Sequence, residues 1–282
     1  MTTAATFSAA LSDAEAREFI PFMHELIATA FRAIRPYFLN ATPVLTKSDA
    51  TPVTQADRGA EEAMRSRIGV RYPAHGVLGE EFGLKEPRSG GQRYRWILDP
   101  VDGTRAFISN CFLFGTLIAL ERDDGSGFRP VLGTIAHPAA GVALIGHASE
   151  CRLYCADGRE RAVRVRACAR LSDATVLATT HWSTREQAGG PAVEALIRSA
   201  RMYRTWGDCF GYFAVATGGA DVMLDPTLAY WDVAAIVPVI EGAGGRVTSW
   251  QGDNPLEKLS VIATGGSLQE EVLRALHAGS TV

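Results

Sequence analysis

Apolar residues recur at helical spacing in two stretches near the start of the chain. The first, residues 19–38, follows the sequence Ser-Asp-Ala-Glu at 12–15, which has the form of a capping box. Pro21 lies inside it, so we expect either a kink or a late helix start with proline in the first turn. The second, from about residue 56 to about residue 71, follows Thr-x-x-Asp at 54–57. The chain therefore begins with two predicted helices.

The apolar runs that follow are shorter and are typical of β-strands. Turn residues separate them, such as Asp-Asp-Gly-Ser-Gly at 123–127, which favours antiparallel neighbours. The expected strands span residues 77–83, 96–99, 112–120, 131–137 and 141–147, with residues 151–154 and 162–165 as extensions.

From about residue 167 onward, strands alternate with helices. The expected strands are 175–178, 220–224 and 260–263, and the expected helices are 191–200, 210–217, 231–244 and 268–278. A proline at position 238 should bend the third of these helices. The whole pattern predicts an α+β protein with stacked helix and sheet layers. We divide it into an α+β domain at 1–149 and an α/β domain at 150–282.

Composition and charge exclude several classes of protein. With 47% hydrophobic and 21% charged residues, the 282-residue chain can bury a substantial core. The net charge is −3 and no long basic run occurs, so we expect no nucleic-acid partner. No window of about 20 apolar residues and no signal peptide are present, so we expect no membrane partner. Five cysteines, an odd number, favour reduced thiols and a cytoplasmic location.

The most informative stretch is Asp-Pro-Val-Asp-Gly-Thr at 99–104, directly after an apolar strand. Asp99 and Asp102 can converge on one point, and the carbonyl of Val101 adds an oxygen between them. Gly103 allows a close approach of the backbone, and Thr104 adds a hydroxyl and an N–H group. Such a donor set suits a hard divalent cation that holds a phosphate. A plain acidic turn remains the alternative for this stretch taken alone.

Three further acids have a similar setting. Glu80 follows an apolar strand, whereas Asp57 and Asp232 lie at predicted helix starts. Ligands that offer only oxygen suit magnesium or manganese better than zinc. A solvated turn for Glu80 and a purely capping role for Asp57 remain alternatives. Other phosphate-handling patterns are absent, since neither a P-loop nor a G-x-S-x-G elbow occurs in the sequence.

Taken together, these motifs resemble the inositol monophosphatase superfamily. The resemblance rests on Gly-Glu-Glu at 79–81, the stretch at 99–104, and Trp-Asp at 231–232 with Gly-Ala-Gly-Gly at 242–245, and it spans roughly residues 47–250. It implies a layered α/β/α/β/α sandwich of the inositol monophosphatase and fructose-1,6-bisphosphatase type. It further implies Mg²⁺-dependent hydrolysis of a small-molecule phosphomonoester by a homodimer, with two or three ions per site and Mn²⁺ as an alternative.

The resemblance also assigns roles to individual residues. Asp57 matches an acid that reaches an additional metal, and Glu80 and Thr104 match the pair that activates the attacking water. Gly103 and Thr104 match the phosphate donors, and Lys47 matches a basic residue near the metal-site loop. The implied metal ligands are Glu80, Asp99, the Val101 carbonyl, Asp102 and Asp232. The domain at 1–149 would thus carry most ligands, and the domain at 150–282 would complete the site.

Within the superfamily the chain is most similar to the histidinol-phosphate phosphatase branch. Residues 47–54, 114–120 and 206–209 carry this likeness, whereas Arg105 departs from it, because Lys or Thr is more usual there.

Substrate recognition is less determined by the sequence. The carboxylates of Asp208 and Asp225 could complement the ammonium and imidazole groups of histidinol phosphate. We predict that Asp102 and Asp232 also contact the substrate. Carboxylates also bind the hydroxyls of an inositol or sugar phosphate, so charge alone does not decide the substrate. Asp208 could instead cap the helix that follows it. A metal-binding regulatory protein without activity is the remaining alternative.

Overall fold

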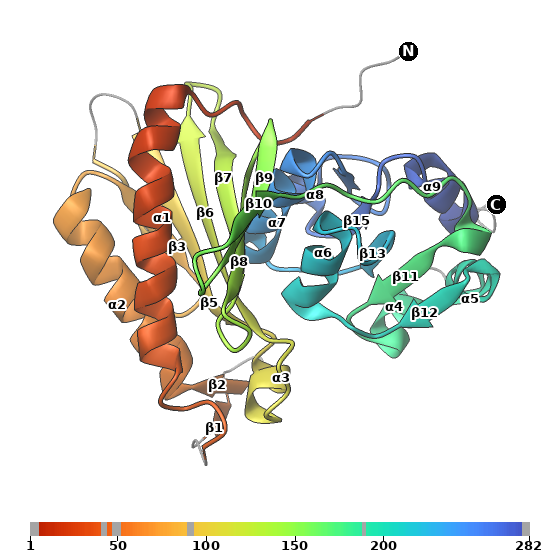
Figure 1. Cartoon of the computed structure of the whole chain (residues 1–282), viewed down its shortest axis with the longest axis horizontal. Helices are drawn as coiled ribbons and strands as arrows, with labels where there is room; N and C mark the ends of the chain where they lie inside the picture. Colours follow the sequence, from red (N-terminus) through yellow and green to blue (C-terminus); the bar gives the residue numbers. More distant parts are fainter. Residues whose placement is uncertain (1–5, 41–43, 47–51, 89–92, 188–189, 278–282) are drawn as a thin grey trace.

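The computed structural model describes residues 6–40, 44–46, 52–88, 93–187 and 190–277, which form five alternating layers of helices and sheets (Figure 1). This confirms the predicted layered sandwich. The helices are α1 (Asp13–Ile34), α2 (Gln55–Arg71), α3 (Thr104–Ile108), α4 (His181–Gln187), α5 (Gly190–Ser199), α6 (Asp208–Ala216), α7 (Tyr230–Gly242), α8 (Pro255–Lys258) and α9 (Gln269–His277).

The first two layers are the α1–α2 pair and a large sheet. The pair covers one face of the sheet (Figure 1), with a core that includes Phe19, Met64 and Trp96 between them. The strands follow the order β10-β9-β8-β7-β6-β5-β3-β4 and are antiparallel except for the β3–β5 pair. They are β3 (Gly76–Gly79), β4 (Gly83–Lys85), β5 (Arg93–Asp102), β6 (Gly115–Asp123), β7 (Phe128–His137), β8 (Val142–His147), β9 (Glu150–Cys155) and β10 (Glu160–Ala162).

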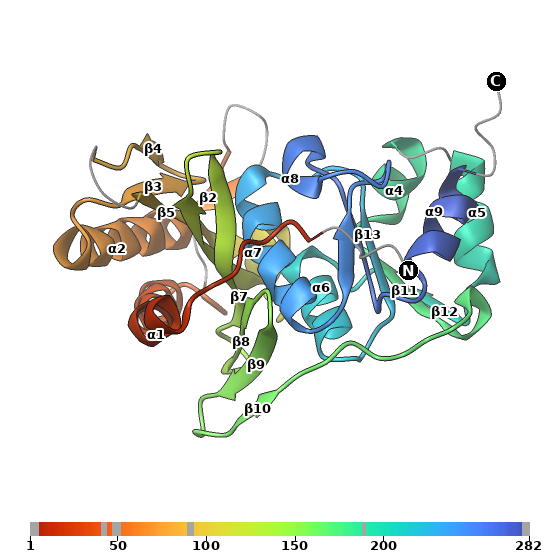
Figure 2. The ribbon, with the colours of Figure 1, turned by 90° about the horizontal axis from the view of Figure 1, so that it is seen from above.

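The other layers are the α6–α7 pair, a five-stranded sheet and an outer helix layer (Figure 2). Helices α6 and α7 lie between the two sheets, while α5 and α9 pack on the far face of the smaller one. The smaller sheet has the order β12-β11-β13-β15-β14, parallel from β12 to β13 and antiparallel beyond. Its strands are β11 (Thr175–Ala178), β12 (Met202–Arg204), β13 (Val222–Asp225), β14 (Arg246–Thr248) and β15 (Val261–Thr264), and a separate hairpin pairs β1 (Val44–Thr46) with β2 (Pro52–Thr54).

Several predicted boundaries were wrong by a few residues. Helix α1 ends at Ile34 rather than near residue 38, and it contains Pro21 without a late start. The strand expected at 112–120 is β6, which begins at Gly115, and the extension expected at 162–165 lies earlier, at β10. Strands β9 and β10 belong to the large sheet, so this sheet continues past residue 149. The division into two domains at that residue stays a prediction.

The sequence predicted a strand that ends before Pro100, but β5 continues to Asp102. The ladder with β6 pairs Asp99 with Leu117 and then resumes at Asp102 opposite Gly115, so β5 carries one extra residue. Proline has no N–H to donate, which favours such an interruption. A β-bulge of this kind re-aims the side chains next to it. The side chain of Thr116 donates to the Pro100 carbonyl at 2.7 Å and so satisfies the bulged backbone.

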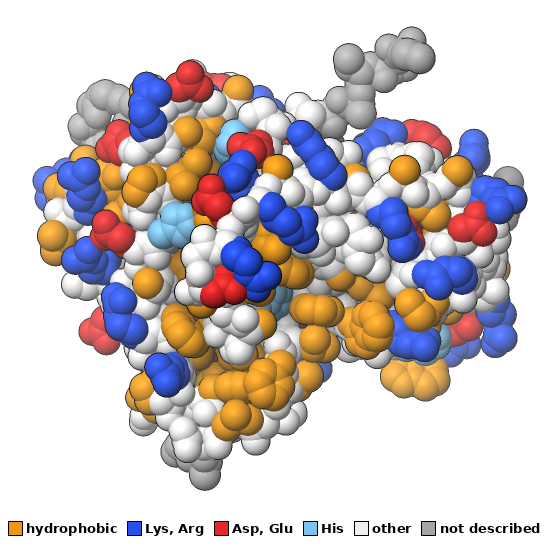
Figure 3. Space-filling view, in the orientation of Figure 1, with side chains coloured by type: hydrophobic (Ala, Val, Ile, Leu, Met, Phe, Trp, Pro, Cys, Tyr) orange, Lys and Arg blue, Asp and Glu red, His pale blue; other side chains and the backbone are white. Residues whose placement is uncertain are grey.

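Among the described residues, no helix combines the length and the apolar character needed to cross a membrane. Large hydrophobic side chains are nevertheless exposed on one face. Figure 3 shows them gathered on the part of the surface where α3 lies in Figure 1. Leu39 and Phe112 are 58% and 56% exposed, and both line an apolar groove of about 290 Å³.

Two glycines in the large sheet allow α7 to pack closely against it. A Cβ atom on Gly146 would lie 2.6 Å from the Cα of Val239 and 2.8 Å from the carbonyl oxygen of Pro238, and one on Gly133 would meet α7 in the same way. These neighbours are backbone atoms or belong to the proline ring, so they cannot move aside singly. The close contact therefore fixes the distance between α7 and the sheet.

We predict that Gly146→Ala lowers the free energy of unfolding by about 1–3 kcal/mol, because overpacked cores lose this much. Urea denaturation would measure the change. Gly69→Ala in α2 is the matched control, since a Cβ there has no neighbour within 4 Å. Replacing a helical glycine with alanine should stabilise by roughly 0.5–1 kcal/mol. A Gly146→Ala protein as stable as the wild type would contradict the close contact.

Candidate metal and phosphate site

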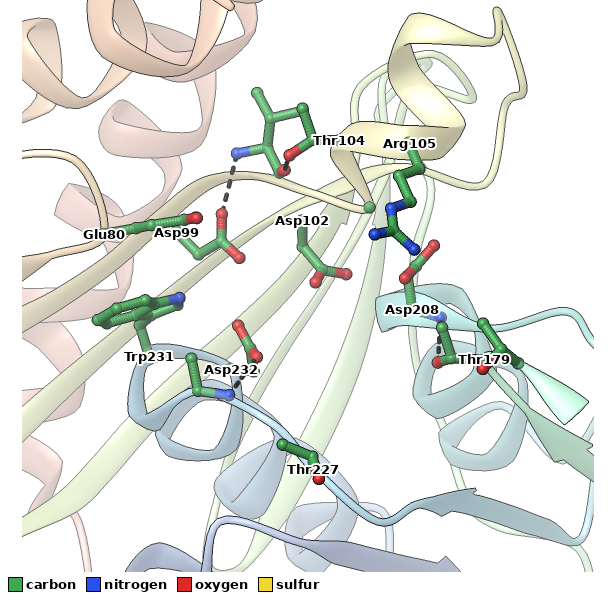
Figure 4. A pocket seen from close by; sticks show the side chains of 14 residues that line it. Glu80, Asp99, Asp102, Thr104, Arg105, Thr179, Asp208, Thr227, Trp231 and Asp232 are labelled. Atoms are coloured by element: carbon green, nitrogen blue, oxygen red, sulfur yellow. Dashed lines mark hydrogen bonds between the residues drawn. The ribbon is translucent and has the colours of Figure 1, made fainter. Parts of the chain in front are cut away.

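Three carboxylates from two layers converge at the end of β5. Asp99 and Asp102 lie on either side of the bulge, and Asp232 comes from the first turn of α7 (Figure 4). One oxygen from each lies within 4.8 Å of the others. The structure therefore brings together three of the acids that the sequence singled out.

Backbone contacts orient these carboxylates. The N–H of Val101 donates to Asp99 at 3.1 Å, and the N–H of Ala229 donates to Asp232 at 2.9 Å. Asp102 accepts the N–H of Cys209 at 2.5 Å, so it also caps the start of α6. The cluster is consequently held by β5, α6 and α7 together.

The negative charge of the cluster is poorly compensated. Burial raises the pKa of Asp99 well above its usual value, and Glu80, Asp102 and Asp232 add to the rise. Burial and the nearby carboxylates of Asp208 and Asp232 do the same to the pKa of Asp102. Burial likewise raises the pKa of Asp232 to about 7. Like charges brought together in this way call for a cation. An all-oxygen donor set at this spacing fits a hard divalent ion.

The capping role of Asp57 is confirmed, whereas its role toward a metal stays a prediction. Its Oδ2 accepts the backbone N–H of Thr54 at 2.9 Å and closes the capping box of α2. Its Oδ1 lies 3.4 Å from the hydroxyl of Thr104, which is also 3.1 Å from the carbonyl of Val101. Asp57 thus caps a helix with one oxygen and faces the site with the other.

Glu80 follows β3 and lies close enough to the cluster to raise the pKa of Asp99. Glu61, which sequence reasoning missed, holds the turn that presents it. The Glu61 carboxylate accepts the N–H groups of Glu81 at 2.7 Å and Phe82 at 3.2 Å, and its side chain is fully buried. The sequence offered one signal for Glu61: it lies four residues after Asp57, so the two side chains share a face of the predicted helix.

The turn after Asp102 is shaped by Gly103. Its φ of 76° lies in the left-handed region, and α3 begins at the next residue. A Cβ atom there would also lie 2.8 Å from a carboxylate oxygen of Asp208. Glycine is therefore favoured here mainly by the left-handed conformation, and an added Cβ would also displace the Asp208 carboxylate. The turn lines a cavity of about 580 Å³ together with the three carboxylates, Thr179, Thr227 and Trp231.

Asp208 does not cap α6, so that alternative was wrong. It is the first residue of the helix, has a φ of 49°, and makes no capping bond with its side chain. Its backbone N–H donates to the Thr179 hydroxyl at 2.9 Å, which turns the carboxylate toward the cavity (Figure 4). The guanidinium of Arg105 faces it from α3, and this positive charge opposes the rise in the pKa of Asp208 that burial causes.

Asp225 lies deeper, in an adjoining cavity of about 520 Å³ that shares Asp102, Asp208 and Asp232 with the first. It accepts hydrogen bonds from the Tyr212 hydroxyl at 2.7 Å and from the Thr179 N–H at 3.3 Å. Burial raises its pKa to about 7. Its contact with substrate stays a prediction. Lys47 lies outside the described residues.

Comparisons with known proteins identify the family of this chain. The model of the inositol monophosphatase family matches residues 15–281. A histidinol-phosphatase of Chlorobaculum parvum is 35% identical over 263 residues, covering 90% of this chain and 95% of that protein. One of Mycobacterium tuberculosis is 36% identical over 240 residues, covering 83% and 88%. A solved inositol monophosphatase from Zymomonas mobilis superposes with a TM-score of 0.79 at 34% identity, covering 95% and 100%. The chain belongs to the inositol monophosphatase family and is a phosphoric monoester hydrolase.

Proposed function

We propose that the enzyme hydrolyses L-histidinol phosphate to L-histidinol and phosphate with Mg²⁺ as cofactor, two or three ions per site, and Mn²⁺ as an alternative. The observation that carries the proposal is the carboxylate cluster of Asp99, Asp102 and Asp232 beside the Gly103 turn, with Asp208 facing the same cavity. The histidinol-phosphatases at 35% and 36% identity support the choice of substrate.

In the proposed mechanism, water would attack phosphorus directly, without a covalent enzyme intermediate, while the bond from phosphorus to the alcohol oxygen breaks and that oxygen takes up a proton from solvent. The residues that would hold the cations are Glu80, Asp99, the Val101 carbonyl, Asp102, Asp232 and, for an additional ion, Asp57. Bound Mg²⁺ supplies a Lewis acid that lowers the pKa of water and offsets phosphate charge.

The protein groups around the cluster would then position the reactants. The Thr104 hydroxyl, oriented between Asp57 and the Val101 carbonyl, would hold the attacking water. Glu80 would accept its proton. The N–H groups of Gly103 and Thr104 would donate to phosphate oxygens, as donors aimed at developing charge do in other enzymes. Lys47 would add a positive charge near this loop.

The alcohol part of the substrate would occupy the cavity beyond the cluster. Asp208 and Asp225 would there face the ammonium and imidazole groups of histidinol, with Asp102 and Asp232 at the boundary. A nearby cationic group favours the ionised form of a buried carboxylate. The second candidate is an inositol or sugar monophosphatase, favoured by the structural likeness to the Zymomonas mobilis enzyme.

We further propose a cytoplasmic homodimer. The five cysteines are free thiols, which fits a reducing compartment. The apolar groove around Phe112 fits an interface between two copies, since large exposed apolar patches mark such surfaces. Sedimentation velocity should give the mass of two chains for the wild type and of one chain for Phe112→Asp. A wild-type mass of one chain would contradict the dimer.

Asp99→Asn should lower kcat/KM by at least ~100-fold, about 2.7 kcal/mol of transition-state binding, because it removes a charge that holds the cation. Phosphate release would measure this. In EDTA, at a pH where Asp99 is ionised, the same variant should melt at the same or a higher temperature than the wild type, since one repulsive charge is gone. Asp124→Asn, in an exposed turn, is the control. Near-normal turnover of Asp99→Asn would rule out its proposed role.

Asp208→Asn should lower kcat/KM for L-histidinol phosphate by at least ~10-fold, or about 1.4 kcal/mol, because it removes the negative charge that meets the cationic alcohol. Inositol 1-phosphate, whose alcohol is neutral, should lose much less. Steady-state phosphate release with both substrates would separate the two effects. Equal losses for both substrates would show that Asp208 does not determine specificity.

A further inference from the structure

A polar network lies behind the first turn of α7. The fully buried carboxylate of Glu121 in β6 accepts a hydrogen bond from the Nε of Arg95 in β5 at 2.8 Å, and the Arg95 Nη2 lies 2.6 Å from the same oxygen in an ion pair. Its other oxygen accepts the hydroxyl of Tyr230, the first residue of α7. The Arg95 guanidinium also lies 4.4 Å from the ring centre of Phe128 and 5.8 Å from that of Tyr230. Glu121 is thus bonded from two directions.

The network joins the two elements that carry the metal-site carboxylates. Arg95 lies four residues before Asp99 in β5, and side chains in a strand alternate, so both point to the α7 face. Tyr230 lies two residues before Asp232 in the first turn of α7. A fixed distance between Arg95 and Tyr230 therefore also constrains the distance between Asp99 and Asp232.

This constraint opposes a specific force. Asp99 and Asp102 belong to β5 and Asp232 belongs to α7, so whenever these carboxylates are ionised their mutual repulsion pushes the helix start away from the strand. Packing against Gly133 and Gly146 holds the middle of α7 rather than its first turn. The Tyr230 hydroxyl acts at the end where the repulsion acts.

We propose that Tyr230 is a positioning residue of the metal site, held by the Glu121–Arg95 pair, which keeps Asp232 in place before the cation binds. The inference rests on the proposed function, because it takes the carboxylate cluster as a Mg²⁺ site. Without this anchor, part of the cation's binding energy would be used to bring α7 back to β5, and the apparent affinity would fall accordingly.

The network is a poor device for stability alone. A buried ion pair adds little compared with apolar residues of similar volume, because both charges must be taken out of water. Its place between β5 and the start of α7 is better explained by the geometry it imposes.

The chain contains a matched control. On the other face of the same sheet, Glu15 of α1 accepts the Tyr94 hydroxyl at 2.8 Å and pairs with Arg122 at 2.8 Å. This second Arg-Glu-Tyr network joins β5 and β6 to α1, which carries none of the proposed ligands. Tyr94→Phe and Tyr230→Phe therefore remove the same chemical group from two networks of the same residue types, only one of which touches α7.

The test is calorimetric titration of Mg²⁺ into the wild type, Tyr230→Phe and Tyr94→Phe, with melting temperatures measured in EDTA. We expect Tyr230→Phe to bind Mg²⁺ about 5-fold to 10-fold more weakly, near the lower end for residues that orient metal ligands. Tyr94→Phe should lose similar thermal stability and keep wild-type affinity. Arg95→Met, which removes the other partner of Glu121, should repeat the loss of affinity if Tyr230→Phe does not fold.

Unchanged affinity in Tyr230→Phe would overturn the inference, and so would an equal loss in Tyr94→Phe. The titration uses Mg²⁺ alone, so its result does not depend on which phosphomonoester the enzyme hydrolyses. A wild type that binds no Mg²⁺ would contradict the proposed function itself, whereas a binding wild type that ignores L-histidinol phosphate would contradict only the substrate.

Discussion

The structure depends on holding like charges together. Oxygens of Asp99, Asp102 and Asp232 lie within 4.8 Å of one another in a largely buried setting, where carboxylates repel strongly. Apolar packing between the two sheets opposes this repulsion along most of α7, and we propose that the Tyr230–Glu121 contact opposes it at the first turn. The cation-free site is therefore electrostatically unfavourable. A bound cation would relieve the repulsion, and this favours cation binding.

The local backbone conformation orients the side chains of the site. The bulge at Pro100 aims two carboxylates from one strand, and the left-handed Gly103 starts a turn whose N–H groups lie beside them. Asp57 caps α2 while it contacts Thr104, and Asp102 caps α6 while it lines the cavity, so helix ends and the site share side chains. A substitution at either position would disturb both.

Much of this could be predicted from the sequence, because local patterns determine it. The capping boxes, the α7 start with Asp232 and the turn after Asp102 are confirmed as local structures. What was missed depends on contacts between distant segments. Glu61 holds the Glu80 turn 20 residues away, Tyr230 reaches Glu121 across 109 residues, and Asp208 takes a left-handed φ that no local pattern indicated. The bulge also extended β5 beyond the expected strand end.

The central claim is a metal-dependent phosphatase whose acidic cavity selects a cationic alcohol. Its most direct test is phosphate release in Mg²⁺ from L-histidinol phosphate, inositol 1-phosphate and several sugar phosphates, each repeated in EDTA. We predict a kcat/KM for L-histidinol phosphate at least ~100-fold above the others, or about 2.7 kcal/mol, and no turnover in EDTA. A flat profile, a preference for inositol phosphate or activity that persists in EDTA would contradict the account.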